Sequence, residues 1–448
     1  YFIDPYILLF DAASVALGHH GGWERLDLLR RLFILKSALV GRRSSRGRRA
    51  FIKKIREMSG YIVRWGWRRD VLQDAERFQR NNRSDSEVLD RLFRDQILGM
   101  YRELAELAAS TPGRFDDEEV ALLGRRLVAC FGRNGGQVPP QYTYLLHENP
   151  RVDSFFVFDD TNPEAKRRWA VHKELAGRRP VEGSEPIFSA DSLSAVLTWA
   201  AVNIVTRSRT EIKMVSSDSL VGTALLKDAL KEVEAAIKVV DPLTLPSLRF
   251  AKPRRIERAI LLANFEQKRT DEQQLERDRR QYLPSNWDIL NYGRDRNSRV
   301  RDVSVITRDS WDQVQCRRSR GRDAVRLAMR YVFHDRTPES LQDAPLTVLV
   351  PDGRTQRAVH DRLQQLISSV EDVASVPIRT GSFRAFAYEV GGRFQVVRRD
   401  HERLRLFNTR SLDGVVRLLS PSGLSNAGIL YDGLSPALSD LRAITKRM

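Results

Sequence analysis

The stretch "GRNGGQVPPQ", residues 132–141, divides the chain into two parts whose apolar residues follow different patterns. Before it, apolar residues recur at the spacing of helix turns. After it, short apolar or alternating runs bounded by polar residues indicate strands, with longer periodic stretches between them. Because glycine and proline interrupt regular structure, we interpret 132–141 as a linker.

This division predicts an α+β fold, in which a helical N-terminal unit, 1–131, precedes a mixed α/β unit with hairpins, 142–448. A second division of the mixed unit is considered near 268–282, a segment crowded with charged residues. The sequence shows no internal repeat.

Three helices are predicted in the first unit, over 25–36, 84–110 and 115–131. The stretch "RLDLLRRLFILK" (25–36) carries an apolar face that we expect to pack against the helix at 84–110. That face consists of Leu28, Leu32 and Leu35. The apolar face of the second helix consists of Leu89, Phe93, Ile97, Met100, Leu104 and Leu107. The acidic run at 116–119 lies at the start of the third helix, where the helix dipole favours negative charge.

The second unit is predicted to alternate strands with helices. The expected strands lie in 154–160, 168–175, 211–217, 258–267, 302–315 and 345–351. The expected helices lie in 189–206, 219–240, 355–370 and 411–420. A hairpin is expected over 383–400, because two apolar runs there are separated only by Gly391 and Gly392, which favour a tight turn.

The composition excludes several classes of protein. Hydrophobic residues make up 42% of the 448 residues, which is too many for a disordered chain. The longest apolar stretches, such as 193–204, are shorter than the roughly 20 residues that cross a bilayer. The two cysteines, Cys130 and Cys316, do not make a disulfide framework, and no secretory signal is visible, so we expect a cytoplasmic protein. The chain begins at Tyr1, without methionine, so we expect either that something was removed or that this is the back part of a longer protein.

The net charge of +17 makes a nucleic acid or another polyanion a partner to consider. The stretch "GRRSSRGRR" (41–49) is the one concentrated basic run, whereas the other arginines are scattered among acidic residues as on a solvated surface. Trp65 and Trp67 flank Gly66 beside arginines, which is compatible with base stacking but is more simply explained by packing of a helix end. We therefore expect no dedicated nucleic-acid site.

No motif in the sequence marks a catalytic or metal site, so no catalytic, cofactor-binding or metal-binding residue is assigned. The glycines of 132–136 are not followed by the Lys-Ser/Thr of a phosphate-binding loop, and neither Gly-x-Ser-x-Gly nor a zincin motif occurs. Apart from one adjacent pair, the histidines are too far apart for metal-ligand spacing. The histidines are His19, His20, His147, His172, His334, His360 and His401.

Several stretches, taken in order, resemble the class I bacterial adenylate cyclases, large cytoplasmic enzymes that make cyclic AMP from ATP. The resemblance extends from the first residues nearly to the last. It is carried by "DPY" (4–6), "RLDLLRRLFILK" (25–36), "WGW" (65–67), "LDRLFRDQILGMYRELAELA" (89–108), "EEVALLGRRLVACF" (118–131), "SRTEIKM" (208–214), "ILLANFE" (260–266), "SVITRDSWDQV" (304–314) and "TGSFRAF" (380–386).

The resemblance implies that the chemistry belongs to an N-terminal nucleotidyltransferase-like domain, marked in the family by Gly-Ser and then Asp-x-Asp. Two such carboxylates hold the divalent ions that neutralise a triphosphate. No Asp-x-Asp occurs in this chain, and neither Gly183-Ser184 nor Gly381-Ser382 leads to one. We therefore expect the catalytic domain to precede Tyr1, with magnesium and ATP bound there and no cofactor in this chain.

The same resemblance implies two partners and leaves two alternatives. The partners are the N-terminal catalytic domain and the glucose-specific phosphocarrier protein of the phosphotransferase system, which acts on the regulatory region of the family. The alternatives are a basic protein that binds nucleic acid or another polyanion, and an interaction module with no enzyme attached. The favoured interpretation is the helical and regulatory part of an adenylate cyclase, a lyase of cyclic AMP biosynthesis.

Overall fold

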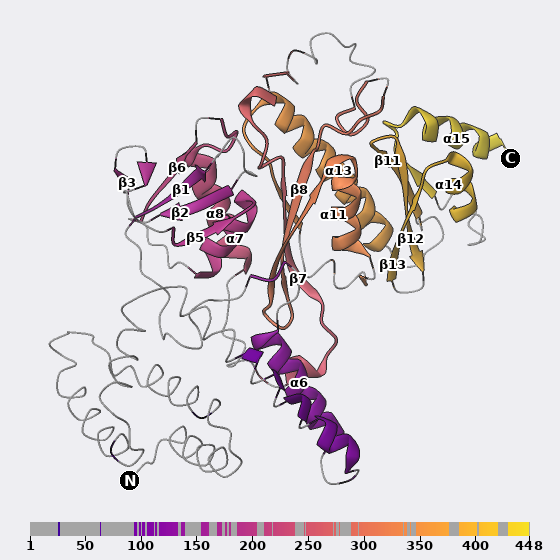
Figure 1. Ribbon diagram of the computed structural model, residues 1–448. Helices are drawn as coiled ribbons and strands as arrows, with labels where there is room; N and C mark the ends of the chain where they lie inside the picture. Colours follow the sequence, from indigo (N-terminus) through magenta and orange to yellow (C-terminus); the bar gives the residue numbers. More distant parts are fainter. Residues whose placement is uncertain are drawn as a thin grey trace. The chain divides into compact units, whose positions relative to one another are not determined.

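The computed structural model of the protein (Figure 1) describes part of the chain in each of two compact units. One unit consists of Tyr1–Gly132 and Gln141–Asn149, and the other of Arg133–Pro140 and Pro150–Met448. The described residues are 26, 63, 94–95, 98–99, 101–103, 105–111, 113, 116–132, 136–138, 154–160, 168–172, 175–176, 179–180, 186–203, 210–216, 218–237, 246, 248–271, 273–274, 277, 288–293, 295–334, 336–337, 341, 346–375, 385–400, 403–419 and 429–447.

In the first unit, helix α6 (Asp117–Phe131) begins where the acidic run was expected to start a helix. The side chain of Asp116 accepts a hydrogen bond from the backbone N–H of Glu118 at 2.9 Å, and three acidic residues occupy the first turn. An acidic cap of this kind satisfies a free N–H group and complements the helix dipole. The dipole interpretation of the acidic run is confirmed.

Residues 101–103 and 105–110 are helical, and Tyr101 packs closely against α6. The Tyr101 hydroxyl donates to the backbone carbonyl of Val120 at 3.2 Å, and its ring lies over Gly124. A Cβ atom on Gly124 would lie 2.0 Å from that hydroxyl oxygen, so glycine permits the close approach. The expected burial of Leu107 is wrong, since its side chain is 48% exposed while the adjacent Ala108 is buried. The other residues of the predicted face, Leu89, Phe93, Ile97, Met100 and Leu104, lie outside the described residues.

The proposed contact of Leu28, Leu32 and Leu35 with the helix at 84–110 lies outside the described residues, as do Trp65 and Trp67. Within 25–36 only Leu26 is described, and it is helical and buried.

The second unit contains three segments with the same order of elements: three strands, a helix, a fourth strand and a second helix. We call each of these segments a repeat. The first repeat consists of β1 (Ser154–Asp160), β2 (Arg168–His172), β5 (Phe188–Ala190), α7 (Leu193–Asn203), β6 (Glu211–Val215) and α8 (Thr223–Ile237). A short hairpin of β3 (Leu175–Ala176) and β4 (Arg179–Pro180) lies between its second and third strands.

The second and third repeats have the same order of elements. The second consists of β7 (Ile256–Ala263), β8 (Asp302–Asp309), β9 (Val314–Arg320), α11 (Ala324–Phe333), β10 (Leu346–Leu349) and α13 (Arg354–Ser375), with α9 (Leu248–Ala251) before it and the 3-10 turn η3 (Gly321–Asp323) before α11. The third consists of β11 (Ala385–Val390), β12 (Arg393–Asp400), β13 (Arg403–Thr409), α14 (Leu412–Leu419), β14 (Ile429–Tyr431) and α15 (Pro436–Arg447).

The strands of the three repeats also pair in the same way. In each sheet the first strand lies between the second and the fourth, and the third strand lies at the edge beyond the second. The first three strands pair antiparallel, and the fourth pairs parallel to the first. The expectation of no internal repeat is therefore wrong at the level of structure. The sequence did not reveal the repeats, because they share a topology rather than a residue pattern.

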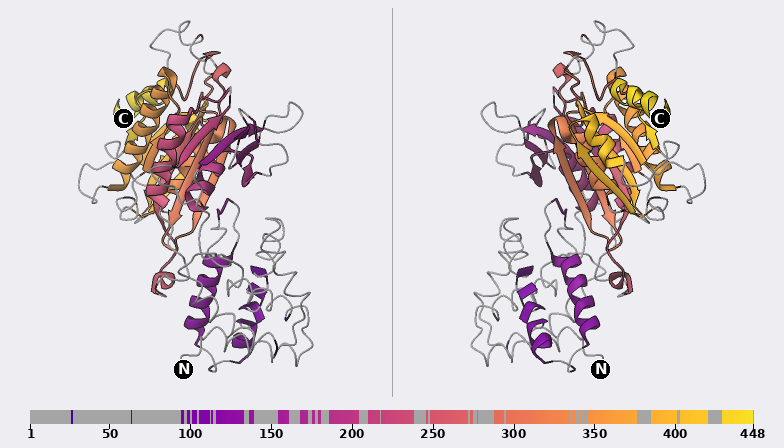
Figure 2. Two further views of the ribbon diagram at one scale, coloured as in Figure 1. Left: turned by 90° about the vertical axis from the view of Figure 1, so that its left-hand side faces the viewer. Right: turned by 90° about the vertical axis from the view of Figure 1, so that its right-hand side faces the viewer.

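The repeats stack, so that each pair of helices fills the space beside a sheet. The core around α7 and α8 includes Phe155 and Val157 from the first sheet and Ile260 and Leu262 from the second. Figure 1 shows these helices between the two sheets, and Figure 2 shows the first and third repeats face on. Burial on both sides explains why α7 is apolar nearly all round, unlike a surface helix with one apolar face.

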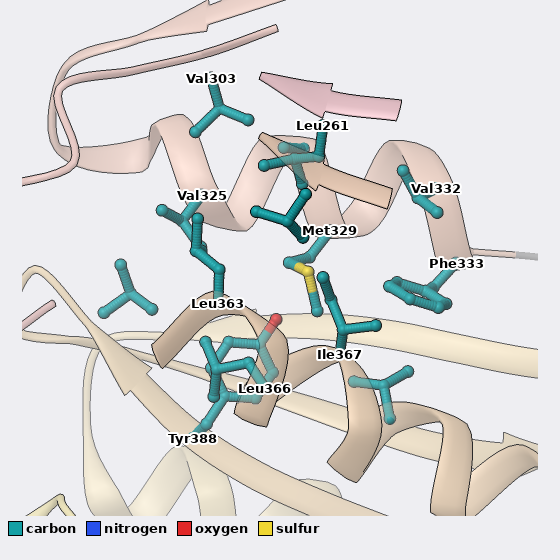
Figure 3. Packing of buried hydrophobic residues seen from close by; sticks show 14 of the residues in the cluster. Leu261, Val303, Val325, Met329, Val332, Phe333, Leu363, Leu366, Ile367 and Tyr388 are labelled. Atoms are coloured by element: carbon teal, nitrogen blue, oxygen red, sulfur yellow. The ribbon is translucent and has the colours of Figure 1, made fainter. Parts of the chain in front are cut away.

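The next core lies on the other face of the second sheet. Leu261 and Val303 from that sheet contact α11 and α13, whose far sides contact Tyr388 of the third sheet (Figure 3). Alternate residues of β7 thus enter different cores, as the two-residue period of a strand requires. The opposite face of the third sheet is covered by α14 and α15, through residues such as Val415 and Leu438.

Most predicted elements of this unit are present, with two differences. The segment 302–315 is not one strand, because a turn at 310–313 separates β8 from β9. The elements that were not predicted are helices α9, α11 and α15 and strands β3, β4, β5, β13 and β14. Strand β5 overlaps the start of the segment 189–206, which was expected to be helical throughout. The hairpin at Gly391–Gly392 is confirmed, and both glycines have positive φ.

Residues 133–140 of the linker and the segment 268–282 both belong to the second unit. Of the linker 132–141, residues 136–138 run along β9, where Gln137 bridges to Gln315. Residues 268–282 belong to the connection between β7 and β8 of one sheet. Among the described helices, none is long and apolar enough to cross a membrane.

Candidate functional site

A pocket of about 400 Å³ lies where β7 ends, β8 begins and β9 ends. Its walls come from the connection between β7 and β8, from the first residue of β8 and from the last residues of β9. It is lined by Glu266, Gln267, Asp271, Gln274, Arg299, Arg301, Asp302, Arg318 and Arg320. The lining therefore combines four arginines with three carboxylates and two amides.

Glu266 fixes one wall of the pocket to the first repeat. Its Oε2 accepts a hydrogen bond from Trp169 Nε1 at 2.8 Å, and its Oε1 accepts one from the backbone N–H of Leu193 at 2.5 Å. Leu193 is the first residue of α7, so the carboxylate satisfies a free N–H group and lies where the helix dipole favours a negative charge. This carboxylate is a structural anchor for the pocket.

Asp302 is the most deeply buried charged group of the pocket, with 4% of its surface exposed. Burial raises the pKa of its carboxyl to about 7, and the negative charge of Glu266 adds to the rise. The charges of Arg318 and Arg320 and the backbone of Glu266 oppose it only in part. At neutral pH this carboxyl is therefore divided between its protonated and ionised forms.

Arg318 approaches Asp302 without forming a hydrogen bond to it. The distance from Arg318 Nε to Asp302 Oδ2 is 4.0 Å, and each of these buried atoms has no hydrogen-bond partner among the described residues. Antiparallel pairing of β8 and β9 produces this arrangement, since Asp302 lies opposite Arg320 and Ser304 lies opposite Arg318.

The guanidinium groups at the end of β9 are held by the chain that leads into α7. Arg318 Nη1 donates to the carbonyl of Asp191 at 3.2 Å, and Arg320 Nη2 donates to the same carbonyl at 3.4 Å. On the other wall, the Arg299 guanidinium lies 4.1 Å from the centre of the Tyr292 ring. These contacts fix the orientation of three positive charges around the pocket.

A chain of side-chain amides supports the floor of the pocket. Asn264 Nδ2 donates to Gln356 Oε1 at 3.1 Å, and Gln356 Nε2 donates to Gln267 Oε1 at 3.3 Å. Asn264 Oδ1 also accepts from the backbone N–H of Arg301 at 3.1 Å. Asn264 has φ +60°, a conformation that asparagine adopts more readily than most residues. The buried amides hold the loop that presents Glu266 and Arg301.

No site residue was assigned from the sequence, so the sequence analysis missed this pocket. One usable signal was the pair of polar residues, Asn264 and Glu266, that directly follows the apolar run of β7. A second was Asp302 at the start of an otherwise apolar strand. Arg318 and Arg320 gave no signal, because arginines are common throughout the chain.

Of the histidines considered for metal binding, His19, His20, His147 and His401 lie outside the described residues. His172 is buried in β2, His334 Nδ1 accepts from the backbone N–H of Leu406, and His360 lies beside Asp361. In the part of the chain that the structure describes, no group of three histidine, cysteine or acidic residues is arranged to hold a metal ion. Gly183, Ser184, Gly381 and Ser382 lie outside the described residues.

Three family models match the chain in order. Residues 1–140 match the second domain of class-I adenylate cyclases, residues 154–241 the third domain and residues 247–382 the fourth domain. The third-domain match covers the first repeat, and the fourth-domain match covers the second repeat together with the whole pocket lining. The third repeat lies beyond the matched residues.

Curated relatives match over most of this chain but only part of their own. The adenylate cyclase of Escherichia coli K12 is 21% identical over 86% of this chain and 45% of its own length. Those of Yersinia intermedia and Proteus mirabilis are 22% and 19% identical, over 93% and 86% of this chain and 47% and 45% of their own. The chain spans about half the length of these relatives, and no solved structure matches it. The ordered matches to three successive domain models show that the chain belongs to the class-I adenylate cyclase family.

Proposed function

We propose that this chain is the helical and regulatory part of an adenylate cyclase, the lyase that converts ATP to 3′,5′-cyclic AMP and diphosphate. The observation that carries the proposal is the order of the matches, to the second, third and fourth domains of the family, over about half the length of the relatives. The numbering of these domains implies a first domain, to which we attribute the chemistry.

The chemistry itself supports this attribution. Cyclisation of ATP needs the triphosphate charge neutralised and the ribose hydroxyl placed in line with the leaving diphosphate, which divalent ions held by paired carboxylates accomplish. The sequence of this chain contains no Asp-x-Asp pair. Arginines bind phosphates but cannot hold a metal ion or act as a base at neutral pH. Magnesium and ATP are therefore assigned to the first domain.

The same proposal includes location and partners. Low cysteine content supports a cytoplasmic location, where the chain would contact its own catalytic domain. Regulation through the glucose-specific phosphocarrier protein is part of the proposal and rests on the family resemblance alone.

The alternative is a basic polyanion-binding protein without catalysis, which the net charge of +17 favours. Ion pairs among the described residues weigh against it. Arg254 pairs with Asp309, and Arg308 pairs with Glu257 and Asp312. Arginines that are already paired contribute less to phosphate binding.

The decisive experiment compares cyclic AMP formation by the 448-residue chain alone and by the chain joined to the preceding coding sequence. We expect no cyclic AMP from the chain alone with magnesium or manganese ATP, and turnover once the upstream domain is restored. Cyclic AMP made by the chain alone, after contamination controls, would place the active site in this chain. A start codon directly before the Tyr1 codon would favour an interaction module instead.

A further inference from the structure

The pocket beside Asp302 contains hydrogen-bonding groups that the described residues do not satisfy. Asp302 Oδ2 and Arg318 Nε are both buried, and at 4.0 Å they are too far apart to bond to each other. Buried polar atoms in folded proteins nearly always have a partner. Both side chains also line the adjoining pocket of about 400 Å³, which has room for more than a water molecule.

The charges around the pocket indicate that such a ligand is an anion. The arginines outnumber the carboxylates of the lining, and one of these carboxylates, Glu266, is already bonded to Trp169 and to the start of α7. Arg318 and Arg320 both donate to the Asp191 carbonyl, and Arg320 also pairs with the Asp191 carboxylate at 3.4 Å. These contacts orient the remaining N–H groups of both guanidinium groups. Planar guanidinium groups held in place match the oxygens of a phosphate better than flexible ammonium groups do.

We propose that the pocket between the ends of β7, β8 and β9 binds a small phosphate-bearing anion, held by Arg318, Arg320 and Arg301 and contacted by the Asp302 carboxyl. The volume lies within the range of small-molecule sites, about 300–1,000 Å³. Inorganic phosphate and the phosphates of a nucleotide share this chemistry. The proposal holds whether or not the chain is part of a cyclase.

Binding at this site should be coupled to a proton. The pKa of Asp302 is raised to about 7, and the groups that face it are Glu266, Arg318 and Arg320. The pocket also contains Asp271, Arg299 and Arg301. A protonated Asp302 donates to a phosphate oxygen, whereas the ionised form repels the anion. Affinity should therefore rise as the pH falls through 7, with uptake of a proton on binding.

The binding test uses titration calorimetry on the 448-residue chain with inorganic phosphate and with metal-free ATP. We expect one site per chain for at least one of these probes, and Arg318→Gln should weaken binding by about ten-fold or more, the usual effect of losing a charged hydrogen bond. Tighter binding of ATP would identify a nucleotide phosphate as the ligand group, and equal binding would identify free phosphate.

The matched control is Arg317→Gln, the adjacent position on β9, whose guanidinium lies 4.3 Å from the centre of the Tyr331 ring rather than in the pocket. This variant loses the same charge and should keep its affinity within about two-fold. If Arg318→Gln does not fold, Arg320→Gln replaces it, since that side chain is 54% exposed. The proposal would be overturned if the pocket variant and the control variant lost affinity equally. It would also be overturned if neither inorganic phosphate nor ATP bound at millimolar concentration.

The proton linkage is tested with sulfate, which is fully ionised across the pH range used. Sulfate affinity should rise from pH 8 to pH 6 in the parent chain. Asp302→Asn removes the titrating group, so this variant should bind sulfate more tightly than the parent at pH 8 and show a flatter pH profile. An unchanged pH profile in Asp302→Asn would show that Asp302 does not contact the anion.

Discussion

Arg362 on α13 and Asp432, which directly follows β14, form a buried ion pair that joins the second repeat to the third. Their side chains are 5% and 2% exposed. The same guanidinium donates through Nε to Asp288 Oδ1 at 3.2 Å, in the connection between β7 and β8. One cation thus neutralises two carboxylates from different parts of the chain, and its loss would leave both buried without a countercharge.

Replacement of Arg362 should therefore destabilise the second unit severely. For Arg362→Ala we expect a loss of about 3–5 kcal/mol in the free energy of unfolding, the usual range for a broken buried ion pair. Arg357→Ala, at an exposed position of the same helix, should change it by less than about 0.5 kcal/mol. Urea unfolding of both variants measures the difference, and similar midpoints would contradict the structural role of Arg362.

The turn between β11 and β12 depends on glycine. Gly391 and Gly392 have φ values of +61° and +70°, and a Cβ on Gly391 would lie 3.1 Å from the carbonyl oxygen of Arg322. Gly391→Ala should cost about 1–2 kcal/mol, because an L-residue is strained in this conformation. Gly433→Ala is the control, since no atom lies within 4 Å of its Cβ position and its φ is not positive. Thermal unfolding that shifts equally in both variants would argue against strain at the turn.

Asp302 should make the chain less stable as the pH rises. Its pKa is about 7 in the folded chain against 3.8 for an unperturbed group, so its contribution to stability is full below pH 3.8 and is lost as the pH rises through 7. Asp302→Asn removes this loss. We expect its stability relative to the parent to increase by about 2–3 kcal/mol from pH 5 to pH 8. Denaturant unfolding at both pH values provides the test, and a difference that stays constant would contradict the raised pKa.

Any binding of this chain to DNA should be weak and independent of sequence. Scattered arginines contact phosphates and release counterions, so the affinity should fall steeply between about 50 and 200 mM salt. Fluorescence anisotropy with labelled duplexes of different sequence measures both properties. A defined footprint on one sequence would instead favour the polyanion-binding alternative.

The sequence predicted many elements of the second unit because each of these buries a regular face. The hairpin at Gly391–Gly392 and the helix α13 follow directly from turn chemistry and apolar spacing. The stacked repeats could not be predicted in the same way, because their connections differ too much. The first two strands are joined by residues 161–167 in the first repeat, by 264–301 in the second and by two glycines in the third.

The pocket escaped prediction for a different reason. Asp302 and Arg318 face each other only because β8 and β9 pair antiparallel in one register. The elevated pKa of Asp302 arises from burial in the assembled fold, which no local pattern specifies. The family resemblance included 260–266 and 304–314, the segments on either side of the pocket, but it carried no assignment for them.

The stacking of the three repeats has a consequence for how the second unit unfolds. Its middle sheet is covered on both faces by helices that also contact a neighbouring sheet, whereas the third sheet has α14 and α15 alone on its outer face. In a linear array each member is stabilised mainly by its nearest neighbours, so members at the ends open first. The backbone amides of β7 and β8 should therefore exchange with deuterium more slowly than those of β13 and β14. Transient opening of a terminal repeat can then occur while the middle sheet, with Asp302 and Arg318, keeps its hydrogen bonds.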